Sequence, residues 1–478
     1  MSTFTIAWIG LPFFVGFIIY LLPKLDRYLA LGMALVSGGY AMLLFTKPPL
    51  TLQLLDNFGV TLVIDQLSGY FILTNALVTV AVMLYCWYSD KTAFFYAQTI
   101  ILHGSINAAF VCADFISLYV ALEVSGIAAF LLIAYPRSDR SIWVALRYLF
   151  ISNVAMLFYL VGAVLAYKAN HSFSFASLRG APPEAIALIF LGLLVKGGIF
   201  ISGLWLPLTH SEAETPVSAM LSGIVVKAGV YPLVRCALMV NEFDPIIRLF
   251  GVGTALLGVF YAVFEKDTKR MLAFHTVSQL GFILAAPKVG GFYALTHGLV
   301  KSALFMTAGA LPSRNFKELQ QKPINTRVWI ALVMASFSIS GFPMLSGFGA
   351  KVLTSKNFLP WQAIAMNIAA LGTAISFAKF IFLPRGGQGE VQRGFWPAVI
   401  LLIASLILAN IVYFEAYTVA NIIKPLAIIG VGWIAYFLIF RRSVLKLPRV
   451  IEQFEHLIGM MSLMLILLFW MVFAWLGI

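Results

Sequence analysis

The sequence predicts an all-α polytopic membrane protein of about 16 transmembrane helices. Two observations lead to this fold class. Hydrophobic residues make up 61% of the 478 residues and charged residues only 11%, with a mean hydropathy of +0.95. Apolar runs of about twenty residues, the length that crosses a bilayer core of roughly 30 Å, recur along the whole chain.

Each apolar run is long enough for one span. In chain order, the predicted spans lie near residues 5–22, 28–46, 66–88, 94–112, 115–134, 142–167, 183–206, 216–239, 246–264, 270–287, 291–311, 329–354, 358–383, 395–413, 425–440 and 457–477. The longest connections, around 47–65 and 168–182, are far shorter than a soluble domain. Function is therefore expected within the membrane.

The first segment and the cysteines add two expectations. The segment FTIAWIGLPFFVGFIIYLLP has neither a basic start nor a small-residue cleavage motif, so we expect a first span rather than a signal peptide. Cys86, Cys112 and Cys236 lie far apart, in or at the ends of spans. They show neither a disulfide framework nor zinc-binding spacing.

The net charge of +13 would suit a nucleic-acid surface, but its placement indicates something else. When successive loops are assigned to alternate sides, most loop lysines and arginines fall on one side, among them Lys24, Arg137, Lys266 and Arg385. By the positive-inside rule, the N-terminus lies outside, as does the C-terminus if the number of spans is even. The charge therefore indicates orientation, and no nucleic-acid partner is expected.

Basic residues also remain inside the predicted spans: Lys196, Lys227, Arg235, Lys301, Lys351 and Lys379. Arg235 lies near the outer end of its span, so we expect its side chain to snorkel to the interface. The others are deeper, and a lysine at a helix centre costs roughly 2.5–3.5 kcal/mol on insertion scales. Such a cost indicates a wet or charge-paired interior with a function.

Glu123, in SLYVALEVSGIAAFLL, is the clearest acidic residue within a span. Asp114 lies at the mouth of the same helix, and Asp65 ends the preceding polar loop. An ionised, unpaired carboxylate is too costly in low dielectric, so Glu123 is either protonated or paired with a buried lysine. A purely structural ion pair between two helices is the alternative.

His297 and Lys301 are four residues apart, which places both on one helix face. Imidazole exchanges protons near neutral pH, so this pairing favours a proton relay over a structural pair. His275 lies at the basic end of its span. It either passes protons to or from the cytoplasm or caps a helix.

Two spans carry helix-breaking residues. ISGLWLPLTHSEAETP contains Pro207, followed by His210, Glu212 and Glu214, and SISGFPMLSGFGAK contains Pro343 and three glycines before Lys351. Non-helical backbone at membrane depth is tolerated only where it is buried in protein or faces a cavity. ISGLWLPL and ISGFPMLS are also alike, which is weak support for a repeat.

Other chemistries leave no trace in the sequence. It contains no cysteine set for an iron–sulfur cluster, no C-x-x-C-H, no G-x-G-x-x-G after a strand and no P-loop. No cofactor is therefore expected, and neither an isolated redox enzyme nor an ATP-driven pump is favoured. Lysine and histidine indicate proton movement rather than sodium binding, which needs several oxygen ligands.

Four motifs together resemble a known family. They are LPLTHSEAETPVSAMLSGIVVKAGVYPLVR (206–235), DTKRMLAFHTVSQLG (267–281), THGLVKSALFMTAG (296–309) and GFPMLSGFGAKV (341–352). Their order and spacing are similar to those of the antiporter-like membrane subunits shared by Mrp-type cation/proton antiporters, respiratory complex I and membrane-bound hydrogenases. The resemblance covers roughly residues 60–390. The SEAETPVSAMLSG and HTVSQLG forms look most like the Mrp D-type subunit.

The resemblance implies a core of 14 helices with two inverted five-helix repeats, each with one discontinuous helix. On this basis we expect an N-terminal three-helix segment at 1–93, repeats at 94–240 and 241–390, and C-terminal helices at 391–478. The last two spans exceed the core, and a packing surface for a neighbouring subunit is one interpretation of them.

The resemblance also implies a chain of charged residues at the membrane midplane. Glu123 matches the fifth-helix glutamate of the family, and Lys196 matches the lysine of the broken seventh helix, which would form a switchable ion pair with it. Lys227 matches the eighth-helix lysine. The remaining matches are the eleventh-helix pair His297 and Lys301 and the twelfth-helix Lys351, while His275 occupies a variable place.

Three functions remain open from the sequence. The first is a proton-translocating subunit of a multi-subunit Mrp-type antiporter, exchanging protons for sodium or another monovalent cation. The second is a proton-pumping membrane subunit of a complex I-like dehydrogenase or a hydrogenase, and the third is an inert spacer. In the first two, the expected partners are other membrane subunits within a bacterial-type energy-coupling membrane, plasma or thylakoid.

Overall fold

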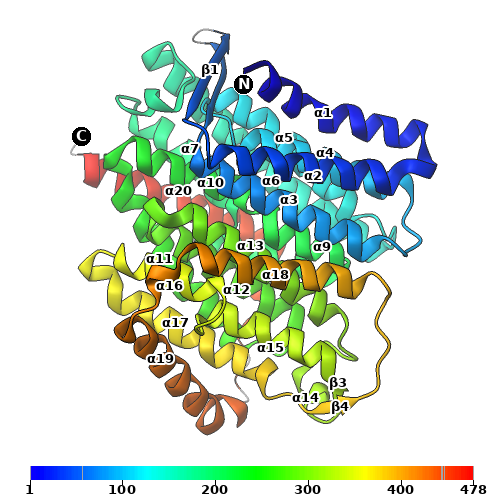
Figure 1. Ribbon diagram of the computed structural model, residues 1–478. Coiled ribbons are helices and arrows are strands. Elements are labelled where there is room, and N and C mark those ends of the chain that lie inside the picture. The colour runs from blue at the N-terminus through cyan, green and yellow to red at the C-terminus, as the bar shows by residue number, and fades with distance from the viewer. Residues whose placement is uncertain (1, 56–57, 443–444, 446, 477–478) are drawn as a thin grey trace.

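The computed structural model describes residues 2–55, 58–442, 445 and 447–476. Long helices lie side by side in one bundle, and the two halves of the chain form neighbouring parts of it (Figure 1). Twelve stretches of the described chain are long and apolar enough to cross a membrane. The protein is therefore an all-α integral membrane protein, as the sequence predicts.

The first half of the bundle extends to the end of α10. Its elements are α1 (Ser2–Leu21), α2 (Asp26–Leu44), β1 (Leu50–Leu55), β2 (Gly59–Ile64), α3 (Gln66–Cys86), α4 (Ala93–Ala109), α5 (Phe115–Ile133), α6 (Asp139–Asn170), α7 (Pro183–Gly197), α8 (Leu206–Glu212), α9 (Thr215–Met220) and α10 (Lys227–Met239).

The second half and the C-terminal helices complete the bundle. Their elements are α11 (Asp244–Phe264), α12 (Thr268–Ala285), α13 (Gly290–Gly309), α14 (Phe316–Leu319), β3 (Ile324–Asn325), α15 (Thr326–Ser340), α16 (Ser346–Lys356), α17 (Pro360–Ile381), β4 (Arg385–Gly387), α18 (Phe395–Val412), α19 (Val419–Leu438) and α20 (Phe454–Leu476). Residue 477, at the end of the last predicted span, lies outside the described residues.

Aspartates fix where several spans begin. Asp65 before α3, Asp114 before α5 and Asp267 before α12 each accept a hydrogen bond from the main-chain N–H three residues later, at 3.0, 2.7 and 2.9 Å. These N–H groups have no partner within their own helix, so the carboxylate stabilises the first turn.

Strands β1 and β2 form an antiparallel hairpin that projects from the bundle, with Leu50 opposite Ile64 (Figure 1). The sequence predicts only a polar connection here. Strands β3 and β4 form a second, parallel two-stranded sheet of five residues in all. Both sheets are small and leave the fold class unchanged.

Helices α12 and α13 occupy the centre of the bundle. Every residue of α12 is buried, and α13 is buried from Gly290 to Ala308 while it packs against α3, α12, α15 and α18. Neither is among the twelve most apolar spans, because a helix surrounded by protein does not have to dissolve in lipid. The expected number of about 16 spans, the 14-helix core and the inverted repeats stay predictions.

Two of the predicted spans are discontinuous. The main chain leaves α7 at Gly198, whose φ is +68°, then forms a 3-10 turn at Phe200–Trp205 before α8 begins. The chain leaves α15 at Gly341, whose φ is +84°, and resumes a helix at Ser346. A left-handed φ favours glycine because it has no Cβ, so these glycines end their helices.

This geometry corrects one prediction and confirms another. Pro207 does not break its helix: it lies in the first turn of α8, where a missing N–H costs nothing, and the break begins nine residues earlier. Aligning ISGLWLPL with ISGFPMLS pairs Gly203 with Gly341. In the structure, however, the left-handed glycine that ends the first helix, as Gly341 ends the second, is Gly198. The second break lies at Gly341–Leu345, as predicted.

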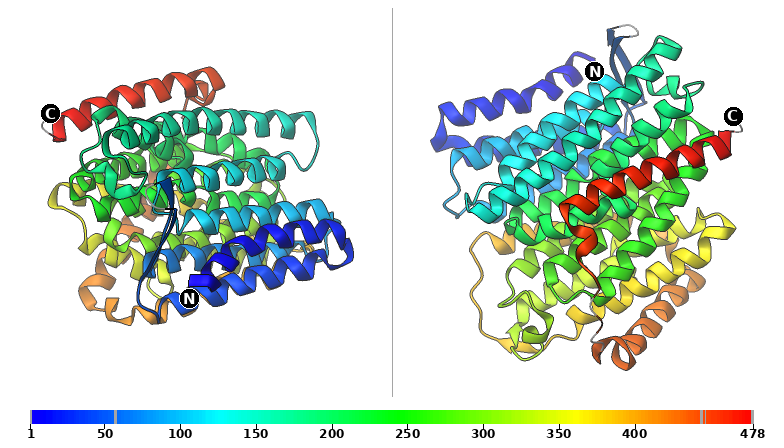
Figure 2. Two further views of the ribbon diagram at one scale, coloured as in Figure 1. Left: turned by 90° about the horizontal axis from the view of Figure 1, so that it is seen from above. Right: turned by 180° about the vertical axis from the view of Figure 1, so that it is seen from behind.

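The last two helices pack on opposite parts of the same chain. Helix α19 packs against α17, while α20 packs against α7 and the turn Phe200–Trp205. In the view from behind, α20 crosses the face of the bundle far from α19 (Figure 2). Part of the apolar surface of both helices is thus covered by this chain itself.

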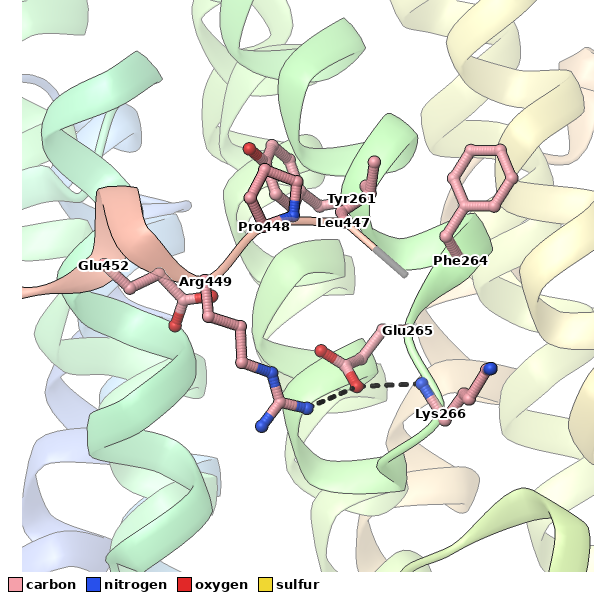
Figure 3. Close-up of a pocket in the computed structure, with 8 residues that line it drawn as sticks. All are labelled: Tyr261, Phe264, Glu265, Lys266, Leu447, Pro448, Arg449 and Glu452. Carbon is pink, nitrogen blue, oxygen red and sulfur yellow. Dashed lines mark hydrogen bonds and ion pairs between the residues drawn. The ribbon is translucent and has the colours of Figure 1, made fainter. Parts of the chain in front are cut away.

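Ionic contacts hold the segment that precedes α20, and Figure 3 shows the one between Arg449 and Glu265. Glu452 accepts a hydrogen bond from Arg270 of α12 at 2.6 Å, and its main-chain carbonyl accepts one from Arg147 of α6. Glu265 binds Arg270 at 3.1 Å and Arg449 at 3.4 Å. The segment therefore links α6 to α12 beside a pocket of about 320 Å³.

Candidate functional site

Lys196 lies in the last turn of α7, directly before the first helix break. Its side chain is 4% exposed, and Nζ donates a hydrogen bond to Oγ of Ser152 on α6 at 2.7 Å. A Cβ added to Gly126 on α5 would lie 2.8 Å from this Nζ. The absence of a side chain at Gly126 thus makes room for the buried amine.

Glu123 lies three residues before Gly126 on α5, close enough to interact electrostatically with Lys196. It does not form an ion pair with Lys196 here: the amine is bound to Ser152, and Oε1 of Glu123 has no hydrogen-bond partner among the described residues. Tyr148 of α6, whose buried hydroxyl also lacks a partner in the described part of the chain, interacts electrostatically with Glu123. The expected switchable pair is therefore open in this structure.

Lys227 begins α10, directly after a turn of π-helix at Leu221–Val225. A π-helical turn displaces main-chain carbonyls from the regular helical pattern and often occurs at functional sites. Nζ of Lys227 donates to the carbonyls of Ser222 at 3.2 Å and Gly223 at 2.6 Å. Two main-chain carbonyls thus solvate a fully buried amine, and no carboxylate among the described residues forms an ion pair with it.

His297 and Lys301 lie on one face of α13, as their spacing predicts, and both are buried. Lys301 donates a hydrogen bond to the carbonyl of Leu272 on α12 and lies 5.1 Å from the ring centre of Phe305. Both ring nitrogens of His297 lack a partner within the described chain. Lys227 is close enough to interact electrostatically with both residues.

His275 does not cap its helix, contrary to one of the two predicted alternatives. Asp267 caps α12, and His275 lies about two turns inside, fully buried, with its ring 4.7 Å from that of Phe377. Neither ring nitrogen has a hydrogen-bond partner among the described residues. Lys301 and Lys351 both lie within electrostatic range.

Lys351 lies in α16, just after the second helix break. Its stem packs on the left-handed Gly341, where an added Cβ would lie 2.8 Å from Cδ of Lys351. Nζ has no hydrogen-bond partner in the described chain and lies 5.5 Å from the ring centre of Phe282. Electrostatic interactions thus connect a second group, apart from Glu123 and Lys196, that consists of Lys227, His297, Lys301, His275 and Lys351.

Two other basic residues within the spans have structural partners. Arg235 is only 6% exposed and does not snorkel, which corrects the prediction: it forms an ion pair with Asp65 and also donates to Ser68 at 3.1 Å. Lys379 donates to the carbonyls of Ala262, Val263 and Glu265 at 3.2, 2.6 and 2.8 Å. It therefore caps the C-terminus of α11.

Sequence reasoning missed the residues that complete the first group: Ser152, Gly126 and Tyr148. Each is an ordinary residue of an apolar span, and only helix packing brings it to Lys196 or Glu123. One signal was available, since Gly126 lies on the same helix face as Glu123, one turn away.

Comparison with known proteins decides the family. Residues 112–376 match the family described as "NADH:quinone oxidoreductase/Mrp antiporter, TM". This match covers more than half of the chain and contains every candidate residue from Glu123 to Lys351. The chain belongs to this family.

Members of the NADH:quinone oxidoreductase/Mrp antiporter family resemble the chain over most of its length. The chain is 26% identical over 452 residues to the D-type subunit of the Na(+)/H(+) antiporter of Alkalihalophilus pseudofirmus, covering 84% of this chain and 91% of that protein. It is 31% identical over 366 residues to the N-type subunit of the NADH-quinone oxidoreductase of Desulforudis audaxviator, covering 68% of this chain and 72% of that protein.

Two solved structures contain a chain with the same fold as this protein. A chain of the archaeal membrane-bound sulfane sulfur reductase complex superposes with a TM-score of 0.77 at 21% identity, covering 90% of this chain and 99% of that chain. A chain of the Mrp complex from Dietzia sp. superposes with a TM-score of 0.74 at 18% identity, covering 95% and 98%.

Proposed function

We propose that the protein is the proton-translocating subunit of a multi-subunit Mrp-type antiporter that exchanges protons for sodium or another monovalent cation. The observation that supports this most is the set of amines and imidazoles inside the bundle, several of which have no hydrogen-bond partner in the described chain. Burying such groups is costly, so their retention favours a role in proton movement.

Lys196 would act as the switch of this mechanism. Its amine is held by Ser152, while Glu123 offers a free carboxylate oxygen nearby. Movement of the amine from Ser152 to Glu123 would close the ion pair and strengthen the hold on the proton, because an adjacent negative charge favours the charged amine. Reopening the pair would release the proton toward Lys227.

The second group would carry the proton onward. Imidazole can accept a proton at one ring nitrogen and release one from the other, which suits His297 and His275 to transfer between lysines. Protons would then pass from Lys227 through His297 and Lys301 to His275. Lys351, beside the second break, would exchange the proton with the outer side.

We also propose how the chain is organised in the membrane and which partners it has. Residues 94–240 and 241–390 would form the two inverted repeats, and both termini would face the outside. The partners would be other membrane subunits of the complex, since chains of the same fold occur in multi-subunit membrane complexes.

The test compares Lys196→Ala with Lys168→Ala in everted vesicles that contain the whole complex. Lys168 is exposed near the end of α6, so its variant controls for loss of a lysine. We expect the sodium-dependent proton flux to fall at least ~10-fold in Lys196→Ala only. Normal exchange by assembled Lys196→Ala would favour the spacer function instead.

The second candidate is a proton-pumping membrane subunit of a redox complex, favoured by the similarity to the NADH-quinone oxidoreductase of Desulforudis audaxviator and by the fold of the sulfane sulfur reductase chain. Purification from native membranes distinguishes the two. Co-purifying iron–sulfur subunits and proton flux driven by an electron donor would support the redox complex. Co-purifying antiporter subunits and flux driven by a sodium gradient would support the antiporter.

A further inference from the structure

His210 is buried and unsatisfied, yet none of the steps above uses it. The ring lies on α8, is 0% exposed, and neither nitrogen has a hydrogen-bond partner among the residues described. By contrast, His103 on α4 is equally buried and fully bonded, with Thr79 at 3.0 Å and Ser37 at 2.8 Å. Because buried polar groups are normally paired, the bare nitrogens of His210 need an explanation.

A polar cavity lies at the junction of α8 and α9, lined by the residue that follows His210. This cavity, the polar basin, has a volume of about 520 Å³ and is lined by residues including Lys91, Ser211, Glu214, Lys269 and Arg314. The volume holds several water molecules. Its wall residue Ser211 directly follows His210, and Lys269 is within electrostatic range of the ring.

The polar basin is kept open by ion pairs and helix-end contacts. Lys91 and Glu214 pair at 2.7 Å across it. Arg314 donates to the carbonyl of Ser211 at 2.9 Å, and Lys269 donates to that of Ala213 at 2.9 Å, so two cations satisfy the carbonyl end of α8. His210 therefore lies in a helix turn whose position is fixed relative to the water-accessible side.

The ring of His210 packs against α13, which carries Lys301. The imidazole stacks on Phe305 of α13 with 4.8 Å between ring centres and an interplanar angle of 18°. The same Phe305 ring lies 5.1 Å from Nζ of Lys301. Lys301 is also close enough to His210 to interact with it electrostatically. His210 thus interacts electrostatically with Lys269, which lines the polar basin, and with Lys301, a lysine of the second group.

We propose that His210 is the access residue that passes protons between the polar basin and Lys301, an inference that rests on the proposed proton translocation. One ring nitrogen accepts a proton from basin water, and the other releases one toward the amine of Lys301. Reorientation of the ring then restores the starting tautomer. This path reaches the second group without passing Lys196.

The test uses the purified complex in proteoliposomes and three variants whose assembly is checked on native gels. His210→Phe keeps a ring that stacks on Phe305 but carries no proton, and His210→Gln keeps polar ends of similar size. His210→Gly opens space for free imidazole. We expect proton flux to fall at least ~10-fold in all three, since a positioned proton-transfer group contributes this much or more.

Added imidazole should raise the flux of His210→Gly and leave the wild type and His210→Phe unchanged. Wild-type flux in an assembled His210→Phe or His210→Gln complex would overturn the proposal, because a merely stacked ring is replaceable by phenylalanine. Lys196→Ala is run in parallel. If the wild type moves no protons under a sodium gradient or with an electron donor, the proposed function itself fails. If Lys196→Ala is defective but the His210 variants are not, only the inference about His210 is refuted.

Discussion

At the scale of single residues, the hydrogen-bond partner of each buried charge separates structural residues from proposed relay residues. Arg235 forms an ion pair with a carboxylate, and Lys379 donates to helix-end carbonyls. The ring nitrogens of His297 and His275 have no hydrogen-bond partner among the described residues, and Lys196 is held by one hydroxyl. A group with strong fixed partners gives up a proton with difficulty, so the weakly held groups are the better candidates for transfer.

The contact of Gly126 with Lys196 makes a first prediction. Gly126→Ala places a Cβ 2.8 Å from Nζ of Lys196 and 3.4 Å from Oγ of Ser152, so the amine must move. We expect antiport in vesicles to fall about 10- to 100-fold, as for other small displacements of a reacting group. Gly39→Ala on α2, with nothing within 4 Å of its Cβ, is the matched control and should keep full activity.

The ion pair of Asp65 with Arg235 makes a second prediction. Burial alone raises the pKa of the Asp65 carboxyl, but hydrogen bonds and charge from Arg235, helped by Ser68, lower the pKa below its ordinary value of 3.8. Because the unfolded chain binds the proton first, this stabilisation is present above about pH 4 and is lost as pH falls through the lower, folded pKa.

Asp65→Asn should therefore destabilise the protein at neutral pH by roughly 3 kcal/mol, since it leaves Arg235 buried without its counter-charge. The loss of stability between pH 4 and lower pH should be smaller in the variant than in the wild type. Thermal unfolding in detergent over this pH range measures both effects, and equal acid sensitivity of the two proteins would contradict the assignment.

At the scale of elements, the two helix breaks set the positions of Lys196 and Lys351. The sequence located the second break through Gly341 and Pro343, but it placed the first at Pro207 instead of Gly198. Proline is compatible with the first turn of a helix, so a proline in the sequence does not show whether a helix is interrupted there or begins there. The decisive feature was a left-handed glycine, and φ depends on the surrounding packing.

Gly198 makes a third prediction. Gly198→Ala forces an L-residue to a φ of +68°, which costs roughly 1–2 kcal/mol, and its Cβ would lie 2.5 Å from Cδ1 of Leu206. Gly198→Asn adds the same Cβ but tolerates the left-handed region better. We expect lower thermal stability for alanine than for asparagine, and equal melting temperatures would exclude backbone strain as the cause.

At the scale of the whole molecule, the C-terminal segment links distant parts of the bundle. Glu452 contacts Arg270 of α12 and Arg147 of α6, and α20 then packs against the broken α7. From the sequence, α19 and α20 were extra spans without an assigned place. In the sequence, the loop charges indicated only on which side of the membrane each loop lies. They could not show which arginine binds Glu452, because that partner depends on the path of the chain in three dimensions.

Glu452 makes a fourth prediction. Glu452→Ala removes one of the two carboxylates that pair with Arg270 and should destabilise the protein by roughly 1.5–3 kcal/mol. Arg449→Ala breaks a contact of a 65% exposed side chain and should cost only about 0–1 kcal/mol. Protease cleavage between α19 and α20, together with thermal unfolding, tests the difference; similar behaviour of both variants would argue against a link through Glu452.

The sequence by itself determined the fold class, the helix spacing of His297 and Lys301, the second break and the set of costly buried lysines, because hydropathy and residue spacing act locally along the chain. Only the tertiary structure decided that Lys196 binds Ser152, that Arg235 binds Asp65, that α12 and α13 are central, and that His210 lies beside the polar basin. These facts depend on contacts between residues far apart in sequence. Hydropathy predicts that a charge is buried, whereas packing alone decides which group faces it.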